Sequence, residues 1–135
     1  MTADILKLRT KKFAVEIVKY YRNLPKTEDA KIIGKQLLRS ATSVAANYRA
    51  VCRARSDAEF FAKLSIVVEE ADETLLWLEI IIESELINDD KTKQLYQEAL
   101  EILSIMAASR KTMKLNKYYK ITKSLNHQIP KSTNL

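Results

Sequence analysis

Glycine and proline are unusually rare in this chain, with one glycine and two prolines among 135 residues. Sheet proteins need many tight turns, which these two residues favour, whereas long helices joined by short connections need few. The scarcity therefore predicts an all-α fold. A chain of this length is the size of one domain with a substantial core. We expect one antiparallel up-down-up-down four-helix bundle over residues 1–123 and a disordered C-terminal tail over residues 124–135.

Apolar residues at helical spacing place a first helix at about Asp4 to Asn23 and a second helix after Thr27, its expected N-cap. Leu24-Pro25 separates the two, because proline disfavours helical geometry in the residue before it. Gly34 interrupts the second pattern, and its missing side chain suits a bulky neighbour such as a tyrosine of the first helix. The expected buried positions are Leu6, Phe13, Ile17, Tyr20 and Leu24, then Ile33, Leu37, Ala41, Val44, Tyr48 and Val51.

The third helix is expected to run from Ser56 to Ile87. It begins with a capping box, in which the side chains of Ser56 and Glu59 each accept a hydrogen bond from the other residue's backbone N–H. One apolar stripe, from Phe60 to Ile82, faces the core. A second stripe lies about a quarter-turn round the helix. A four-helix bundle needs one buried face per helix, so the second stripe predicts self-association through the second and third helices. Its members are Ile66, Glu70, Glu73, Trp77 and Ile80.

A fourth helix is expected from about Lys91 to Ile121, after the polar break Asn88-Asp89-Asp90. Its inward positions are Leu95, Ala99, Ile102, Leu103, Met106 and Met113. Three short connections between four long helices make sequence neighbours antiparallel, which gives the up-down-up-down order.

Charge is distributed unevenly along the chain. Residues 1–55 hold 13 basic and 4 acidic groups, residues 56–101 hold 3 and 13, and residues 102–135 hold 7 and none. An acidic segment between two basic flanks can serve attraction between helices of one bundle, attraction between subunits, or a basic outer surface for a polyanion.

The helices on either side of residue 56 carry polar groups where a plain bundle would place apolar ones. A carboxylate beside tryptophan and isoleucine must be paired or exposed. We therefore expect Glu70 and Glu73 to pair with Arg39, Arg49 or Arg53. The candidates for polar pairing or for a subunit interface are Arg39, Ser40, Asn47, Tyr48, Glu70, Glu73 and Trp77.

The same carboxylates allow an enzymatic interpretation. Glu69-Glu70-x-x-Glu73 resembles the first magnesium-binding motif of the all-helical nucleotide pyrophosphatases, in which clustered glutamates hold magnesium against a triphosphate. Those enzymes add a Glu-x-x-Asp motif on a later helix, and Glu98 with Glu101 is a poor substitute for it. We rank this interpretation below the non-catalytic ones.

The sequence lacks the residues that other catalytic and metal sites of helix bundles need. His127 is the only histidine, whereas a di-metal carboxylate bundle needs a Glu-x-x-His pair on two helices and a Ser-His or Cys-His site needs a positioned base. We predict no catalytic residue, no metal and no cofactor. Cys52 is the only cysteine, and neither a signal peptide nor a membrane-spanning run is visible. A cytoplasmic location without membrane contact is expected.

Basic residues in two regions form a candidate nucleic-acid-binding surface. Cations at three- and four-residue spacing on a helix can follow a phosphate backbone, and the neighbouring Tyr118 and Tyr119 could stack on unpaired bases. A solvated helix end, whose cations suit the helix dipole, explains the same residues. The candidates are Arg49, Arg53, Arg55, Arg110, Lys111, Lys114, Lys117, Lys120 and Lys123.

Several of these motifs together resemble a known family over about Phe13 to Tyr118. They are Arg39-Ser40-Ala41-x-Ser43-Val44-Ala45-Ala46-Asn47-Tyr48-Arg49-Ala50, Arg53-Ala54-Arg55-Ser56, Lys63-Leu64-Ser65-Ile66 and Glu70-Ala71-Asp72-Glu73-Thr74-Leu75-x-Trp77-Leu78-Glu79. The sequence is similar to bacterial four-helix-bundle proteins named after open reading frames in intervening sequences of 23S ribosomal RNA genes. Many members have Asn-Ile-Ala-Glu-Gly where this chain has Asn47-Tyr48-Arg49-Ala50-Val51, so it resembles a branch with Asn-Tyr-Arg.

The resemblance implies a bundle that assembles into a ring, expected to be a pentamer, with no established catalytic activity. A more distant likeness to the accessory subunit of diversity-generating retroelements implies contact with RNA or with a nucleic-acid enzyme such as a reverse transcriptase. We therefore expect a non-catalytic homo-oligomer that serves as an RNA-binding or ribonucleoprotein accessory module. The alternative is a protein-protein interaction scaffold without a nucleic-acid role.

Overall fold

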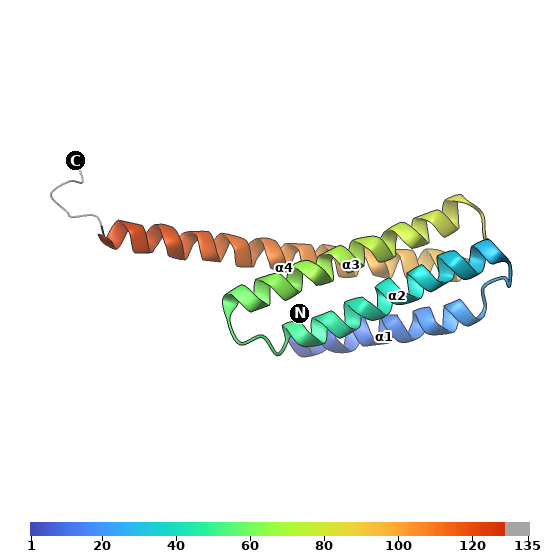
Figure 1. Cartoon of the computed structure of the whole chain (residues 1–135), viewed down its shortest axis with the longest axis horizontal. Coiled ribbons are helices and arrows are strands. Elements are labelled where there is room, and N and C mark those ends of the chain that lie inside the picture. The colour runs from blue at the N-terminus through green and yellow to red at the C-terminus, as the bar shows by residue number, and fades with distance from the viewer. Residues whose placement is uncertain (129–135) are drawn as a thin grey trace.

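The computed structural model describes residues 1–128, except for the side chains of residues 117–119 and 126–128. This part of the chain forms four helices and no strand, which confirms the all-α prediction. The helices are α1 (Ala3–Arg22), α2 (Glu28–Val51), α3 (Asp57–Glu83) and α4 (Asp90–Gln128). Sequence neighbours pack side by side in up-down order, and α4 continues past one end of the bundle (Figure 1).

The helix ends differ in part from those expected. Thr27 makes no side-chain cap to the backbone: its hydroxyl donates to Asp29 (2.6 Å), and the Asp29 carboxylate accepts from the backbone N–H of Ala30. These hydrogen bonds, the one from Thr27 first, lower the pKa of Asp29. Ser56 caps α3 by accepting from the N–H of Glu59, as predicted, but the Glu59 carboxylate accepts from Arg55 rather than from Ser56.

The third helix is shorter and the fourth longer than predicted. α3 ends at Glu83 instead of Ile87, because Glu85 adopts a positive φ of 57° and the N–H of Leu86 turns back to the carbonyl of Ile81. α4 runs to Gln128, so residues 124–128 of the expected tail are helical. Residues 129–135 lie outside the described residues. We name residues 115–128 the α4 extension.

The core lies along the axis of the bundle, and all four helices contribute to it. The most extensive contact joins α2 to α3, and among the pairs of neighbouring helices α1 and α4 have the sparsest contact. Gly34 is buried, and a Cβ there would stand 2.8 Å from Leu24 Cδ1 and 3.0 Å from Tyr21 Cδ2. This confirms the expected tyrosine of the first helix and explains why glycine occupies the site. The largest fully buried side chains include Ile17, Leu37, Leu64, Leu78, Ile81, Ile102 and Met106.

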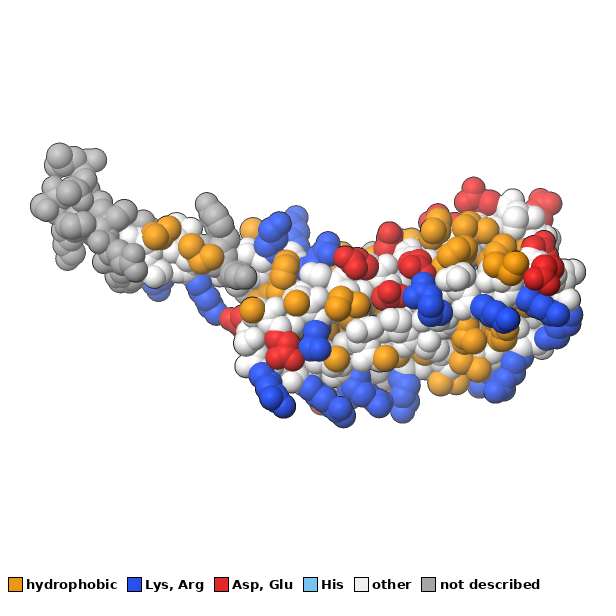
Figure 2. All heavy atoms as spheres, viewed as in Figure 1, with side chains coloured by type: hydrophobic (Ala, Val, Ile, Leu, Met, Phe, Trp, Pro, Cys, Tyr) orange, Lys and Arg blue, Asp and Glu red, His pale blue; other side chains and the backbone are white. Residues whose placement is uncertain are grey.

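Charge follows the helices. Figure 2 shows Lys and Arg along the side formed by α1 and α2 and on α4 towards its C-terminal part, whereas Asp and Glu gather over α3 and the α3–α4 turn. Within residues 1–128, no helix is both long and apolar enough to cross a membrane.

Candidate nucleic-acid interface

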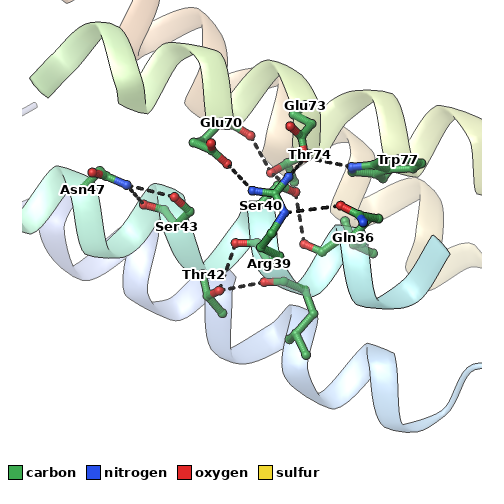
Figure 3. A network of polar contacts seen from close by, with 12 residues as sticks. Gln36, Arg39, Ser40, Thr42, Ser43, Asn47, Glu70, Glu73, Thr74 and Trp77 are labelled. Atoms are coloured by element: carbon green, nitrogen blue, oxygen red, sulfur yellow. Dashed lines mark hydrogen bonds and ion pairs between the residues drawn. The ribbon is translucent and has the colours of Figure 1, made fainter. Parts of the chain in front are cut away.

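Arg39 is the centre of a polar network between α2 and α3 (Figure 3). Its guanidinium forms ion pairs with Glu70 (3.2 Å) and Glu73, and its Nε donates to Gln36 (3.3 Å). The indole N–H of Trp77 donates to the Glu73 carboxylate at 3.1 Å. The prediction that Glu70 and Glu73 pair with a basic residue of the second helix is confirmed for Arg39. Arg49 lies in the last turn of α2, and Arg53 lies in the turn that follows this helix.

This network occupies the carboxylates on which the pyrophosphatase interpretation depends. Two of its three glutamates already bind Arg39. Glu98, the weak substitute for a second motif, accepts two hydrogen bonds from Arg9 (2.6 and 2.9 Å), which raise the pKa of Arg9. Among the described residues, no group of three or more His, Cys, Asp or Glu side chains is placed to hold a metal ion.

The other candidates for polar pairing make contacts within the chain. Ser40 is fully buried and accepts a hydrogen bond from Thr74 (2.9 Å), and Asn47 donates to Ser43 on its own helix. Tyr48 is buried, and burial raises its pKa to about 12. These contacts explain the conformations of the side chains in a single chain. Their part in a subunit interface stays a prediction.

The second stripe of α3 is partly covered by its own chain. Trp77 and Ile80 are half-buried, and Trp77 packs against the core. Ile66, however, is 42% exposed, and Leu76, which was not among the predicted members, is 48% exposed. The apolar surface left on the outer face of α3 therefore consists mainly of Ile66 and Leu76.

The first group of predicted basic residues lines a hollow between the end of α2 and the start of α3. We call it the α2–α3 hollow. Its volume is about 380 Å³, and Glu59, whose carboxylate is engaged by the Arg55 backbone, is its one acidic member. Sequence reasoning missed Lys63, which adds a fourth cation. The lining residues are Ala46, Arg49, Ala50, Arg53, Arg55, Glu59 and Lys63.

A second hollow lies on the other side of the first turns of α3, against α4. This α3–α4 hollow has a volume of about 530 Å³ and is lined by Phe61, Ala107, Arg110, Lys111 and Lys114. Three of the five were predicted as nucleic-acid-binding. Phe61 was not singled out, although the sequence contained a signal for it. Phe60 fits the core stripe of α3, so the adjacent aromatic has to lie off that stripe.

The α4 extension carries the remaining candidates. Lys120 and Lys123 are exposed, and Lys120 pairs with Asp57 at 3.2 Å. The side chain of Lys117 lies outside the described residues. Steps of three residues fall about 60° short of a full turn on an α-helix, so lysines at 111, 114, 117, 120 and 123 wind round α4. These positions therefore follow a helical path that starts at the α3–α4 hollow, rather than a straight line along α4.

The predicted basic residues are brought together at one end of the molecule. The two hollows flank the first turns of α3, and the α4 extension leads away from the second hollow. No described residue forms a salt bridge with Arg49, Arg53, Arg55, Lys63, Arg110, Lys111 or Lys114 within 4.0 Å, so their charges are not neutralised at close range. Such an arrangement can bind a polyanion along its backbone.

Comparisons with known proteins agree with the fold. The model of the family described as 23S rRNA-intervening sequence protein matches residues 5–108. A crystal structure of a protein with unknown function from the S23 ribosomal protein family of Bacteroides thetaiotaomicron is 35% identical in sequence. Its TM-score is 0.75, and the match covers 82% of this chain and 99% of that one. No curated protein matches. The chain therefore belongs to the 23S rRNA-intervening sequence protein family.

Proposed function

We propose that this protein binds RNA, without catalysis, through the basic surface around the first turns of α3. The observation that carries the proposal is the pair of hollows, which together hold seven Lys and Arg side chains and a single carboxylate. Charges of one sign crowded at one end of a bundle repel each other. They are best accommodated by a polyanion that neutralises several of them together.

The dimensions of the surface suit an extended ligand. The hollows lie on two sides of one helix, and the α4 extension adds a helical segment about 20 Å long. A nucleic-acid strand passing from the α2–α3 hollow to the extension would meet cations along its whole path. The family description refers to 23S rRNA-intervening sequences, which supports RNA as the first polyanion to test.

Copies of this chain are further proposed to associate through the outer face of α3. The side chains of Ile66 and Leu76 are apolar and exposed on α3, the helix that makes the most extensive contact with α2. We include the expected ring of five identical subunits in this proposal. A ring would repeat the basic surface once per subunit and so raise the avidity for a long RNA. The second candidate function, a scaffold without nucleic-acid binding, rests on the same apolar residues.

The RNA proposal is tested by charge reversal and salt. Fluorescence anisotropy with a labelled RNA should show binding whose affinity falls steeply with salt. For about five phosphate contacts, the slope of log K against log salt is near −3.5 for a single strand. Lys111→Glu with Lys114→Glu should weaken binding by about tenfold or more and make the slope shallower.

Lys31→Glu with Lys35→Glu is the matched control. It makes the same change of charge at exposed positions near the start of α2, far from both hollows. We expect it to change the affinity by less than about threefold, through the net charge alone. Equal losses from the two double variants would contradict a localised site. No binding to the unmodified protein at low salt would overturn the proposed function.

A further inference from the structure

Phe61 lies where an aromatic ring has no evident structural purpose. It is half-buried on α3 and is not among the residues packed against the core, unlike the adjacent Phe60. Successive residues on an α-helix point about 100° apart, so Phe60 turns inward while Phe61 faces the α3–α4 hollow. A partly exposed phenylalanine leaves apolar surface in water, which a ligand with an apolar face would cover.

The rest of the hollow is cationic. Arg110 is half-buried, Lys111 and Lys114 are exposed, and Ala107 supplies a small floor beside them. The volume of about 530 Å³ falls within the range typical of small-ligand sites, about 300–1,000 Å³. A flat apolar ring next to three cations is complementary to one ligand chemistry above others, namely an aromatic base joined to a phosphate.

We propose that the α3–α4 hollow binds one unpaired nucleotide of a single-stranded RNA, with its base stacked on Phe61 and its phosphates held by Arg110, Lys111 and Lys114. This inference rests on the proposed RNA-binding function and specifies the form of its ligand. The base has to be unpaired, because a duplex keeps the faces of its bases inside the stack and offers only phosphates and groove edges to a protein.

The neighbouring contacts fit this arrangement. Asp57 lies one turn before Phe61 on α3 and pairs with Lys120 of the α4 extension at 3.2 Å. Both partners are well exposed, so the pair is weak and readily exchanged for a phosphate. A strand leaving the hollow can therefore continue along Lys120 and Lys123.

The inference is tested by comparing two RNA probes of the same sequence. One is a labelled single strand of about 12 nucleotides, a length within the site sizes of single-strand binders, and the other is its blunt duplex. Phe61→Leu keeps an apolar side chain but removes the aromatic face. Loss of one base stack should lower the affinity for the single strand by about tenfold and leave the affinity for the duplex within about twofold.

Two further variants separate stacking from structure. Phe61→Trp should keep the affinity for the single strand, and its extra indole fluorescence should be quenched when the single strand binds. Val15→Ala, which removes a partly exposed apolar side chain from α1, outside both hollows and outside the proposed subunit contact, should leave both affinities unchanged. Circular dichroism of the Phe61 variants should match the unmodified protein, because Phe61 is not part of the core.

The outcomes are distinguishable. If Lys111→Glu with Lys114→Glu weakens both probes while Phe61→Leu weakens neither, the proposed function stands and the stacking site is wrong. If the duplex binds as tightly as the single strand, the stacking site is wrong as well. If neither probe binds the unmodified protein, the proposed function itself fails.

Discussion

Two buried hydroxyl groups join α1 to α4, the two neighbouring helices with the sparsest contact. Tyr20 and Thr92 are 5% and 1% exposed, and their oxygens lie 2.7 Å apart. Burial raises the pKa of Tyr20 above its usual value, so the phenol keeps its proton throughout the neutral range. The hydrogen bond thus supplements apolar packing where that packing is thinnest.

Thr92→Val tests how much this hydrogen bond contributes to the free energy of unfolding. Valine has nearly the shape of threonine, so the variant leaves the Tyr20 hydroxyl buried without a partner and should lower the free energy of unfolding by about 1–3 kcal/mol. Adding Tyr20→Phe removes the unsatisfied group and should recover most of the loss. Urea denaturation of the two single variants and the double variant measures this. A Thr92→Val protein as stable as the original would show that the bond contributes nothing.

Residue-level predictions from the sequence succeeded where charge and position were sufficient. Glu70 and Glu73 needed a cation on the adjoining helix, and Arg39 lies at the matching height. The partnership of Phe61 with Arg110 and Lys111 could not be predicted, because it depends on how α3 and α4 are rotated against each other. Spacing within one helix does not determine that rotation.

Among the elements, the end of α3 is determined by backbone conformation rather than by hydrophobicity. Leu86 and Ile87 continue the apolar pattern, and both are half-buried, so the sequence suggested a longer helix. Glu85 instead takes the left-handed conformation usual for the glycine that follows a helix, and the N–H groups of Glu85 and Leu86 bind the carbonyls of Ile82 and Ile81. The sequence has no glycine at this turn, so the end of α3 could not be predicted from it.

Glu85→Gly should therefore stabilise the protein. A non-glycine residue in the left-handed region costs roughly 1–2 kcal/mol, part of which the greater chain entropy of glycine offsets, so the expected gain is about 0.5–1 kcal/mol. Ser84→Gly is the control, since Ser84 has an ordinary φ of −79° and glycine there should destabilise. Thermal and urea unfolding can detect both effects. A loss of stability in Glu85→Gly would mean that the glutamate side chain holds the turn.

Four elements and their order followed from the sequence because apolar spacing and the rarity of glycine and proline agree. The extent of α4 did not. No described side chain beyond residue 114 belongs to the core or packs against it, so polarity suggested an early end. The segment up to Gln128 nonetheless contains no glycine or proline, and its leucine, lysine and glutamine residues favour a helix. Burial predicts where a helix packs, whereas local propensity determines how far it continues.

For the whole molecule, the proposal of self-association makes the mass in solution the decisive measurement. Light scattering should return a multiple of the 15.5 kDa chain. Ile66→Lys with Leu76→Lys places two charges in the proposed contact and should reduce the mass to that of one chain. Leu8→Lys, at a residue of α1 that is 63% exposed, should leave the mass unchanged. A monomeric original protein at micromolar concentration would contradict the proposal.

The asymmetry of the bundle has a consequence for such an assembly. Among the helices of residues 1–128, α4 alone extends beyond the other three, and it does so at one end (Figure 1). In a closed cyclic oligomer all subunits point the same way along the symmetry axis. A ring of these chains, with the bundles aligned along its axis, would consequently have two different faces. The α4 extensions with their lysines would project from one face and not from the other. An RNA strand bound by the α4 extensions would approach the ring from that side alone and would contact successive subunits around its circumference.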